Sequence, residues 1–346
     1  MDKRVLIVTN AQDMHADIVE CKLRDRNARP FRINLDQFPR DFSVDLAFGP
    51  RGLEGSLRHV PSDDVIALEQ VGATWVRKSA KFSFISDDLA AQERAFAHAE
   101  TEHLFFSLLH SLDCFWMSHP SATRSALWKG EQLRRAAQMG FRVPRTLISN
   151  SPEAVRRFKE TLNRQIIFKT MSSPSLSAHE VAPADRRYGG LPTTLVSDDH
   201  LASIDAVREV PCLFQEHVPK KHELRVTVIG TRAFAARIHS QLDSRTVTDF
   251  RDYSAEIPYD AAKLPAELEA RCVAFVRSYG LEFGAIDLIV TPQDEVVFLE
   301  NNPVGQFLFV EQLVPELKMT DAVSELLTHA TAKEWRFADS NLHPGT

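Results

Sequence analysis

The beginning of the chain alternates strand and helix patterns, and this order constrains the fold more than any other feature. A β-branched run, RVLIVT, is followed by a helical pattern in HADIVECKLRDRNA and then by a second strand pattern, PFRINLD. Strand, helix and strand in this order predict a parallel sheet. The first loop, NAQDM, has no glycine, so the phosphate-binding fingerprint of dinucleotide folds is missing. The sequence therefore predicts an α/β protein whose first domain does not bind a nucleotide at this loop.

Charge and cysteine content exclude several classes of protein. A formal net charge of -6 argues against nucleic acid as a partner, because binding many phosphates needs a basic excess. The widely spaced cysteines form no CxxC motif and predict reduced thiols in the cytoplasm: Cys21, Cys114, Cys212 and Cys272. The first apolar run is too short for a signal peptide, and no window reaches about 18 apolar residues. We therefore expect neither export nor a membrane partner.

Two strand patterns near the C-terminal end, FGAIDLIV and EVVFLENN, predict an antiparallel hairpin that ends in polar residues. If Thr291 and Val296 close this hairpin, Asp287 lies directly opposite Glu300, with Cβ atoms about 4.5–5.5 Å apart. Asn302 lies two residues beyond Glu300 and shares its face. Two carboxylates and a carboxamide oxygen then converge, which suits Mg²⁺ completed by waters and phosphate oxygens. The letters NNPVG fit an ordinary turn equally well, and the residues alone leave both interpretations open.

Two lysines favour a phosphate-bearing substrate. Lys129 sits early in a helix predicted from about Ser125 to Gly140, and Lys169 ends the apolar strand pattern IIFK. A lysine that closes an apolar strand must be solvated or paired, although each lysine taken alone also fits a solvated surface charge. The pattern LFQEHVPKKHELRV then offers an apolar run with backbone groups beyond it, as an adenine would require. Glu223 follows as a candidate ribose acceptor.

Seven elements occur in a characteristic order between about Pro120 and Leu327. Lys129 on a helix and Lys169 at a strand end are followed by FQEHV, ELRV, DFR, GAIDLIV and FLENNP. This order resembles the ATP-grasp ligase superfamily. Within it, AARIHSQ, DFR and LENNPVGQFLFVEQ most resemble the graspetide, or microviridin-type, macrocyclases of ribosomally made peptides. Those enzymes carry a GQW- or GQF-like extension after the metal-binding asparagine.

The resemblance implies a role for the polar residues of these motifs. Six residues would bind the phosphates, adenine and ribose of ATP, in that order: Lys129 and Lys169; Gln215, Glu216 and Val218; and Glu223. Three residues would hold two Mg²⁺ ions, with Glu300 bridging them: Asp287, Glu300 and Asn302. Arg225 and Arg251 would face the γ-phosphate and the acceptor carboxylate, which suits guanidinium groups. His239 would lie near the same cleft, and either His239 or Asp249 is a candidate to assist deprotonation.

The resemblance also implies an architecture. An N-terminal parallel-sheet domain over 1–116 would precede two ATP-grasp lobes that enclose the nucleotide. The central lobe would cover 117–211, the C-terminal lobe with the metal site 212–335, and a tail 336–346. The leader of a precursor peptide would dock within Asp185–Glu209. There, Asp198 and Asp199 fit either a contact to a basic leader residue or a solvated helix N-terminus.

The implied activity is carboxylate activation on a ribosomal precursor peptide with a leader and a Thr/Glu-rich core. An Asp or Glu side chain of the peptide would attack the γ-phosphorus of ATP, and a Thr, Ser or Lys side chain would then close an ω-ester or ω-amide ring. No residue is required as a covalent nucleophile, which is consistent with catalysis by positioning. A homodimer is left open.

The chain departs from the family at two places, and rival functions remain. The loop after Lys169 reads SSPSLS where many relatives have glycines, and Asn301 stands where an aliphatic residue is usual. By strand periodicity Asn301 points away from the metal, as a turn residue or as a donor that orients its neighbours. The first rival is a ligase that joins an amino acid or glutamate to a separate molecule. The second is an ATP-binding regulator without catalysis, and the third is coincidence of the seven matches.

Overall fold

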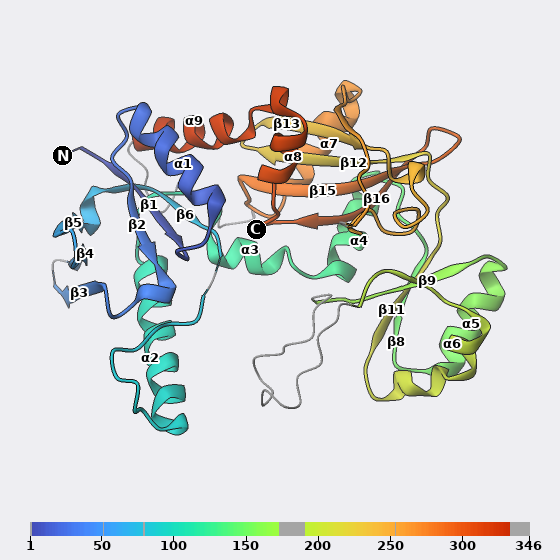
Figure 1. The fold of residues 1–346 in the computed structure, drawn as a ribbon, viewed down its shortest axis with the longest axis horizontal. Helices are drawn as coiled ribbons and strands as arrows, with labels where there is room; N and C mark the ends of the chain where they lie inside the picture. Colours follow the sequence, from blue (N-terminus) through green and yellow to red (C-terminus); the bar gives the residue numbers. More distant parts are fainter. Residues whose placement is uncertain (1, 51, 79, 173–190, 253, 333–346) are drawn as a thin grey trace.

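The computed structural model describes residues 2–50, 52–78, 80–172, 191–252 and 254–332. Three bodies follow one another along the chain: a domain in blue and cyan on the left of Figure 1, a lobe in green at the lower right, and a lobe in yellow to red at the upper right. The expected tail, 336–346, lies outside the described residues. Among the residues described, no helix is long and apolar enough to cross a membrane.

The N-terminal domain contains the predicted parallel sheet. Its strand order is β2-β1-β6-β7, with every pair parallel. The elements of this domain are β1 (Arg4–Thr9), α1 (Met14–Asp25), β2 (Phe31–Asn34), β3 (Phe42–Gly49), β4 (Gly52–His59), β5 (Asp64–Ala67), β6 (Val71–Val76), α2 (Ala91–His110) and β7 (Phe115–Trp116). Strands β3, β4 and β5 form a separate antiparallel meander. The β-α-β opening was therefore predicted correctly.

The last helix within the described residues, α9 (Met319–Thr331), connects the N-terminal domain to the C-terminal lobe. It lies beside α1 (Figure 1), and Lys22 Nζ donates a hydrogen bond of 2.7 Å to Asp321. Val5 and Ile7 of β1 share one buried cluster with Val323 of α9. Burial of such apolar side chains contributes roughly 1.5–3 kcal/mol each, so the two ends of the chain stabilise one another.

The central lobe is an antiparallel sheet in the order β10-β9-β11-β8. Its elements are β8 (Thr146–Ser149), α5 (Pro152–Leu162), β9 (Ile166–Lys169), β10 (Thr194–Leu195), α6 (Asp198–Ala202) and β11 (Cys212–Glu216). Ser151 caps α5 by accepting a hydrogen bond of 3.2 Å from the backbone of Ala154, and Pro152 takes the first helical position, where its missing N–H costs nothing. Asp198 and Asp199 occupy the first turn of α6, which Ser197 caps.

The C-terminal lobe is a five-stranded antiparallel sheet in the order β14-β13-β12-β15-β16. Its elements are β12 (His222–Ile229), β13 (Arg232–Ile238), β14 (Tyr259–Ala261), α7 (Ala266–Arg277), β15 (Phe283–Val290), β16 (Val296–Asn302) and α8 (Leu308–Leu313). Buried Val226, Phe275 and Phe298 join the sheet to α7. Strands β12 and β13 are joined by a turn at Gly230, where φ is 60°.

The predicted helix from about Ser125 to Gly140 begins later than expected. The structure has two helices, α3 (Pro120–Ser125) and α4 (Lys129–Gln138), because Ala126 ends the first and Trp128 precedes the second. Gly140 follows α4 with a φ of 80°, as a terminating glycine should. As a consequence, Lys129 is the first residue of α4 rather than a residue in its second turn.

The hairpin of β15 and β16 closes one residue tighter than predicted. Val290 pairs with Val296, and the Thr291 N–H donates to the Glu295 carbonyl at 2.9 Å, so Thr291 does not pair with Val296. A bulge between Asp287 and Leu288 then takes up one extra residue, Leu299, on β16. Asp287 consequently does lie opposite Glu300. The predicted pairing is confirmed, although the predicted hairpin register is wrong.

Candidate functional site

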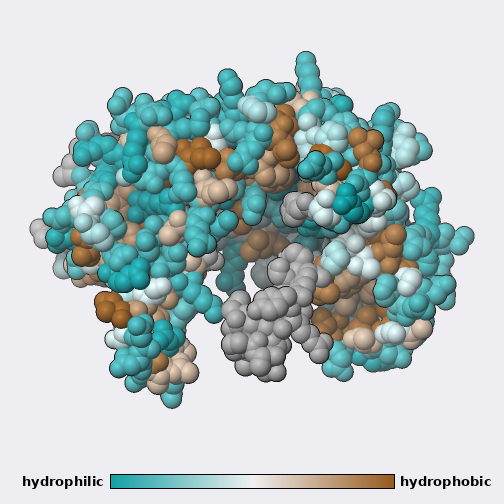
Figure 2. All heavy atoms as spheres, viewed as in Figure 1, coloured by the Kyte–Doolittle hydropathy of each residue, from teal (hydrophilic) through white to brown (hydrophobic). Residues whose placement is uncertain are grey.

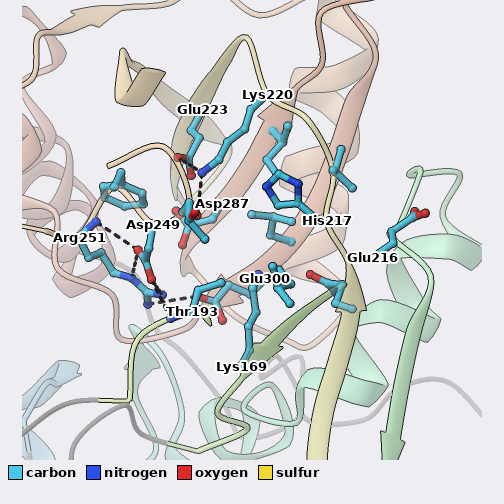
Figure 3. A pocket seen from close by; sticks show the side chains of 17 residues that line it. Lys169, Thr193, Glu216, His217, Lys220, Glu223, Asp249, Arg251, Asp287 and Glu300 are labelled. Carbon is cyan, nitrogen blue, oxygen red and sulfur yellow. Dashed lines mark hydrogen bonds and ion pairs between the residues drawn. The ribbon is translucent and has the colours of Figure 1, made fainter. Parts of the chain in front are cut away.

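A cavity between the central and C-terminal lobes collects most of the predicted site residues (Figure 3). It is lined by strand β9 and the end of β11 on one side, and by β12, β15, β16 and the loop 248–251 on the other. Nine of the predicted residues line it: Lys169, Gln215, Glu216, Val218, Glu223, Asp249, Arg251, Asp287 and Glu300. The structure therefore brings these residues together in one place.

One end of this cavity is an apolar slot. Ile167 comes from the central lobe, and Val218, Ile289 and Leu299 form a small cluster on the opposite side. Facing apolar walls of this kind fit a flat aromatic ring. The end of β11 and the residues after it, through Val218, form the hinge between the two lobes. Its two polar side chains are already bonded within the protein, because Gln215 donates to Thr146 Oγ1 at 2.9 Å and Glu216 accepts from the Arg145 backbone at 3.1 Å. They can contact a ring chiefly through their backbone.

Beyond the slot lies a buried ion pair that the sequence did not reveal. Lys220 Nζ donates to Glu223 Oε1 at 2.7 Å and to the Thr248 carbonyl at 3.0 Å (Figure 3). The side chains of Lys220 and Glu223 are only 5% and 6% exposed. In the sequence, Lys220 belongs to a PKK run that is typical of surface. The three-residue spacing to a glutamate at the start of a strand was the available signal.

Asp287, Glu300 and Asn302 converge as predicted, and cations face each carboxylate. Arg225 Nη1 donates to both carboxylate oxygens of Asp287, at 2.7 and 2.8 Å, and Asn302 Nδ2 donates to Asp287 Oδ2 at 3.2 Å. Lys129 Nζ lies 3.1 Å from Glu300 Oε2. Lys129 is further fixed by a 2.9 Å hydrogen bond to the Thr170 carbonyl, so it joins α4 to the end of β9.

The two carboxylates differ in their electrostatic environment. Burial raises the pKa of Asp287, and Arg225 offsets this only in part. Burial acts in the same direction on Glu300, but Lys129, Lys169 and Arg251 together bring the pKa of Glu300 below its usual value. Burial lowers the pKa of Lys169, while Glu300 opposes that effect. Glu300 is therefore an ionised acid at the centre of three cations.

These residues fit a magnesium ion that shares its ligands with a phosphate. Two carboxylates and an amide supply oxygen donors, which Mg²⁺ prefers. Within the described ranges, no three His, Cys, Asp or Glu side chains gather into a group that could hold a metal. An ion held by Asp287 and Glu300 would therefore need the Asn302 amide, waters and phosphate oxygens as further ligands. Turning that amide by half a rotation exchanges its nitrogen for its oxygen beside Asp287.

Arg251 is held toward Glu300 by a carboxylate. Asp249 accepts from Arg251 Nε at 2.8 Å and from Nη2 at 2.7 Å, and Arg251 Nη1 lies 4.0 Å from Glu300 (Figure 3). Burial opposes ionisation of Asp249, but Arg251 and a hydrogen bond from Thr193 bring its pKa far below the usual range. Because Thr193 belongs to the central lobe and Arg251 to the C-terminal lobe, Asp249 connects the two.

A second cavity, of about 300 Å³, opens beside the first and shares Arg251, Asp287 and Glu300 with it. Arg225, Asn302 and the segment 303–306 form another part of its lining. This segment turns tightly, with the Gly305 N–H bonded to the Asn302 carbonyl at 3.1 Å. A Cβ on Gly305 would lie 2.7 Å from that of Ala285, so only glycine fits there. The shared residues stand where the two cavities meet.

His239 lies outside both cavities. Its ring is bonded to Asp260 of β14, and it is absent from the lining of either cavity. On β13, Ala236 and Ile238 pair with Arg225 and Glu223, which do line the cavities, so strand alternation directs the next residue away. His239 is therefore not a lining residue of either cavity, and its position near the cleft and its catalytic role stay predictions.

Asn301 belongs to strand β16 and is not a turn residue. Its side chain is buried over Gly284, on the face away from Glu300 as periodicity predicted, and both amide atoms lack partners among the described residues. Its backbone is bonded instead, since the side chain of Gln132 accepts from the Asn301 N–H at 2.8 Å and donates to its carbonyl at 2.9 Å. Gln132, three residues after Lys129, thus fixes α4 against β16. Most of the loop SSPSLS lies outside the described residues.

Comparison with known proteins agrees with this geometry. Residues 4–124 match the family described as the MvdD pre-ATP grasp domain. Macrocyclase MdnC from Microcystis aeruginosa MRC, solved with its precursor peptide MdnA, is 29% identical with a TM-score of 0.82, over 94% of this chain and 99% of that one. An ATP-grasp ligase associated with RiPPs, from Chryseobacterium gregarium and solved with ADP and a leader and core peptide, is 27% identical with a TM-score of 0.84, over 94% and 97%. No curated protein sequence matches the chain.

A further structure, macrocyclase MdnB from Microcystis aeruginosa MRC, is 27% identical with a TM-score of 0.75, over 94% of this chain and 99% of that one. The fold and the cavity define an ATP-grasp enzyme, an ATP-dependent ligase. Within that superfamily the chain is most similar in sequence and fold to graspetide macrocyclases, as its motifs predicted. The residue roles that the resemblance implied remain predictions, which the geometry described above supports to different degrees.

Proposed function

We propose that this protein is a peptide macrocyclase that uses ATP to close ω-ester or ω-amide rings within a ribosomal precursor peptide. One observation carries the proposal: Arg251, Asp287 and Glu300 line both a narrow cavity with an apolar slot and a wider second cavity. A nucleotide in the first cavity then directs its γ-phosphate toward a peptide carboxylate in the second. Such an arrangement is what transfer of a phosphoryl group between two bound molecules requires.

The nucleotide is proposed to bind along the first cavity. Its adenine fits the slot beside the hinge residues Gln215, Glu216 and Val218, and its ribose meets Glu223. The triphosphate then runs toward Lys169 and Lys129, which flank Glu300. Asp287, Glu300 and Asn302 hold Mg²⁺, and two ions with Glu300 between them are proposed. The metal neutralises charge on the phosphates when it is bound.

The residues of the chain orient the reacting groups. Arg225 and Arg251 receive the peptide carboxylate, one oxygen of which attacks the γ-phosphorus while the bond to ADP breaks. A hydroxyl or amine of the same peptide then attacks the acyl carbon, and phosphate leaves. Because both oxygens of Asp249 are bonded to Arg251 and its pKa is far below the usual range, we assign Asp249 to hold Arg251 rather than to accept a proton.

The leader of the precursor is proposed to dock on the central lobe. An apolar cavity of about 340 Å³ lies between the sheet and the segment 194–207, within the range expected for leader docking. Phe168 and Phe214 of the sheet line it, together with Val196, Ile204 and Val207 of that segment. Figure 2 shows hydrophobic residues gathered on this lobe, at the lower right of the view. The proposed partner is a peptide with a Thr/Glu-rich core, in the cytoplasm, and a homodimer remains a proposal.

Mass spectrometry tests the function directly. The protein, ATP and Mg²⁺ are incubated with a leader-core peptide encoded near its gene, and the expected product is lighter by one water per ring. A gain in mass by a joined molecule would point to the intermolecular ligase instead. ATP binding without ADP release, with any peptide or amino-acid acceptor, would favour the regulator.

A further inference from the structure

The segment that follows the predicted metal ligands is held from behind by the N-terminal domain. His15 Nε2 accepts hydrogen bonds of 3.2 Å from the backbone N–H groups of both Phe307 and Leu308. The imidazole also meets the Phe307 ring edge to face, with centroids 4.8 Å apart. His15 is the second residue of helix α1, directly after the first β-α connection of the chain. A residue near the N-terminus thus contacts a segment almost three hundred positions away.

Two charged residues fix the ring of His15 and its surroundings. Asp13 is fully buried and accepts from Thr9 Oγ1 at 2.7 Å and from Arg77 Nε at 3.2 Å, while its other oxygen lies 3.4 Å from His15 Nδ1. Arg77 reaches the Gly305 carbonyl at 3.5 Å. Its guanidinium centre also lies 5.8 Å from the centre of the Phe307 ring.

The hydrogen bonds define which form of His15 is present. An Nε2 that accepts two N–H groups carries no proton, so the ring is neutral and its proton is on Nδ1, facing Asp13. Burial lowers the pKa of His15, which keeps the ring neutral although Asp13 opposes this effect. Arg77 and Lys78 are the other charges that act on it, and both favour the neutral form.

The same segment forms one wall of the second cavity. Residues 302–306 line it directly, and on that side Arg225 Nη2 donates to the Gln306 carbonyl at 3.2 Å. The segment is therefore clamped between Arg225 in the cavity and His15 behind it. Within the described residues, no hydrogen bond joins His15, Asp13 or Arg77 to the residues that form the apolar slot of the first cavity.

We propose that Asp13, His15 and Arg77 are positioning residues for the peptide side of the reaction, acting through the segment 305–308. The proposal rests on the proposed macrocyclase function, because it assigns the second cavity to the acceptor peptide. It makes the N-terminal domain part of the catalytic apparatus without any contact to the reacting atoms. The affinity of the first cavity for the nucleotide should be independent of these residues.

Three variants test this proposal. His15→Met removes the acceptor at similar length, and His15→Gln retains an acceptor oxygen. Arg4→Met removes a similarly buried polar side chain from the same domain. Arg4 is bonded to Asp64 and to the Arg29 carbonyl, and none of its hydrogen bonds or ion pairs within the described residues reaches 303–308. We expect His15→Met to lower kcat for ring closure by about 10- to 100-fold, the usual range for residues that orient ligands indirectly. The affinity for ADP should stay unchanged, His15→Gln should recover most of the activity, and Arg4→Met should keep kcat.

Hydrogen exchange followed by mass spectrometry supplies a readout that needs no product. In His15→Met the backbone of 305–310 should exchange faster, and in Arg4→Met it should exchange as in the unmodified protein. Unchanged exchange in His15→Met, or equal losses of kcat in His15→Met and Arg4→Met, would overturn the proposal. If the unmodified protein closes no ring on any peptide, the proposed function fails separately, and the exchange data still decide whether His15 holds the segment.

Discussion

Glu300→Gln is the substitution that best distinguishes an effect on metal binding from an effect on folding. Glu300 lies on β16 with 19% of its side chain exposed, 3.1 Å from Lys129 and 4.0 Å from Arg251. Glutamine keeps the shape and one carbonyl oxygen but removes the negative charge. We expect the variant to fold and to lose turnover.

The structure indicates the size of both effects. Removing one partner of a buried ion pair costs about 3–5 kcal/mol, and because Glu300 retains some solvent contact we expect the lower end of that range. Loss of a metal ligand removes several kcal/mol of charge stabilisation in the transition state. At about 1.4 kcal/mol for each factor of ten, a loss of about 4 kcal/mol lowers kcat by roughly a thousandfold.

Two measurements distinguish the effects. ADP release with a peptide acceptor gives kcat, and calorimetry with ADP in the presence and absence of Mg²⁺ gives the advantage that the metal confers on binding. That advantage should disappear in Glu300→Gln, because the metal loses the ligand that we assign to it. ADP itself should still bind, because Lys129 and Lys169 contact its phosphates without the metal. Glu295→Gln is the matched control: Glu295 lies at the other end of the same strand pair, is 57% exposed and is paired only with Arg142 at the surface.

The control should retain full turnover and full metal dependence. A Glu300→Gln variant with unchanged kcat, or with the same preference for Mg-ADP over ADP as the unmodified protein, would refute the assignment of Glu300 to the metal. If Glu300→Gln does not fold, calorimetry gives no signal, and Glu300→Asp is used in place of that variant. Aspartate keeps the charge but places it one methylene further from the metal site. The variant should therefore fold, whereas its kcat should stay low.

Three further predictions concern other parts of the site and the fold. Lys220→Met should cost about 3 kcal/mol in urea unfolding because it leaves buried Glu223 unpaired, and Glu223→Gln in the same chain should restore part of that loss; simple additivity of the two changes would contradict the pairing. Gly305→Ala should lower kcat/KM for the peptide at least tenfold while ADP binds as before, since the new Cβ displaces the wall of the second cavity; a normal kcat/KM would show that the wall can yield. Burial, reinforced by the charge of His110, lowers the pKa of His119 from 6.5 to about 4. As the pH falls, the unfolded chain therefore takes up a proton before the folded chain does. The free energy of unfolding should then fall by about 3 kcal/mol between pH 6.5 and pH 4. His119→Asn should remove this component of the pH dependence, and an unchanged slope would argue against it.

The pairing of Asp287 with Glu300 shows what the sequence could predict. Alternation and the polar strand ends were enough to place the two carboxylates and Asn302 on one face. The turn was placed one residue wrongly, and the bulge at Leu299 compensated for the error. A bulge has no reliable sequence signature, because its cost depends on how the strand must bend over its neighbours.

Residues that act through long-range contacts could not be found in this way. His15 and Arg77 look like an ordinary helix start and a strand end, and only the packing of the N-terminal domain against 305–308 gives them a role. Gln132 and Lys220 lie close in sequence to predicted ligands, but their bonds to Asn301 and Thr248 depend on the arrangement of whole elements. Local patterns predict elements and faces, whereas these contacts form only when the lobes come together.

The central claim is that this protein activates side-chain carboxylates of a peptide through an acyl phosphate. The most direct test uses a precursor peptide whose Asp and Glu carboxylates are labelled with heavy oxygen, incubated with the protein, ATP and Mg²⁺. Each ring closed should release one phosphate that carries one heavy oxygen from the peptide, together with one ADP and a peptide lighter by one labelled water equivalent. Ring closure accompanied by unlabelled phosphate would contradict the account.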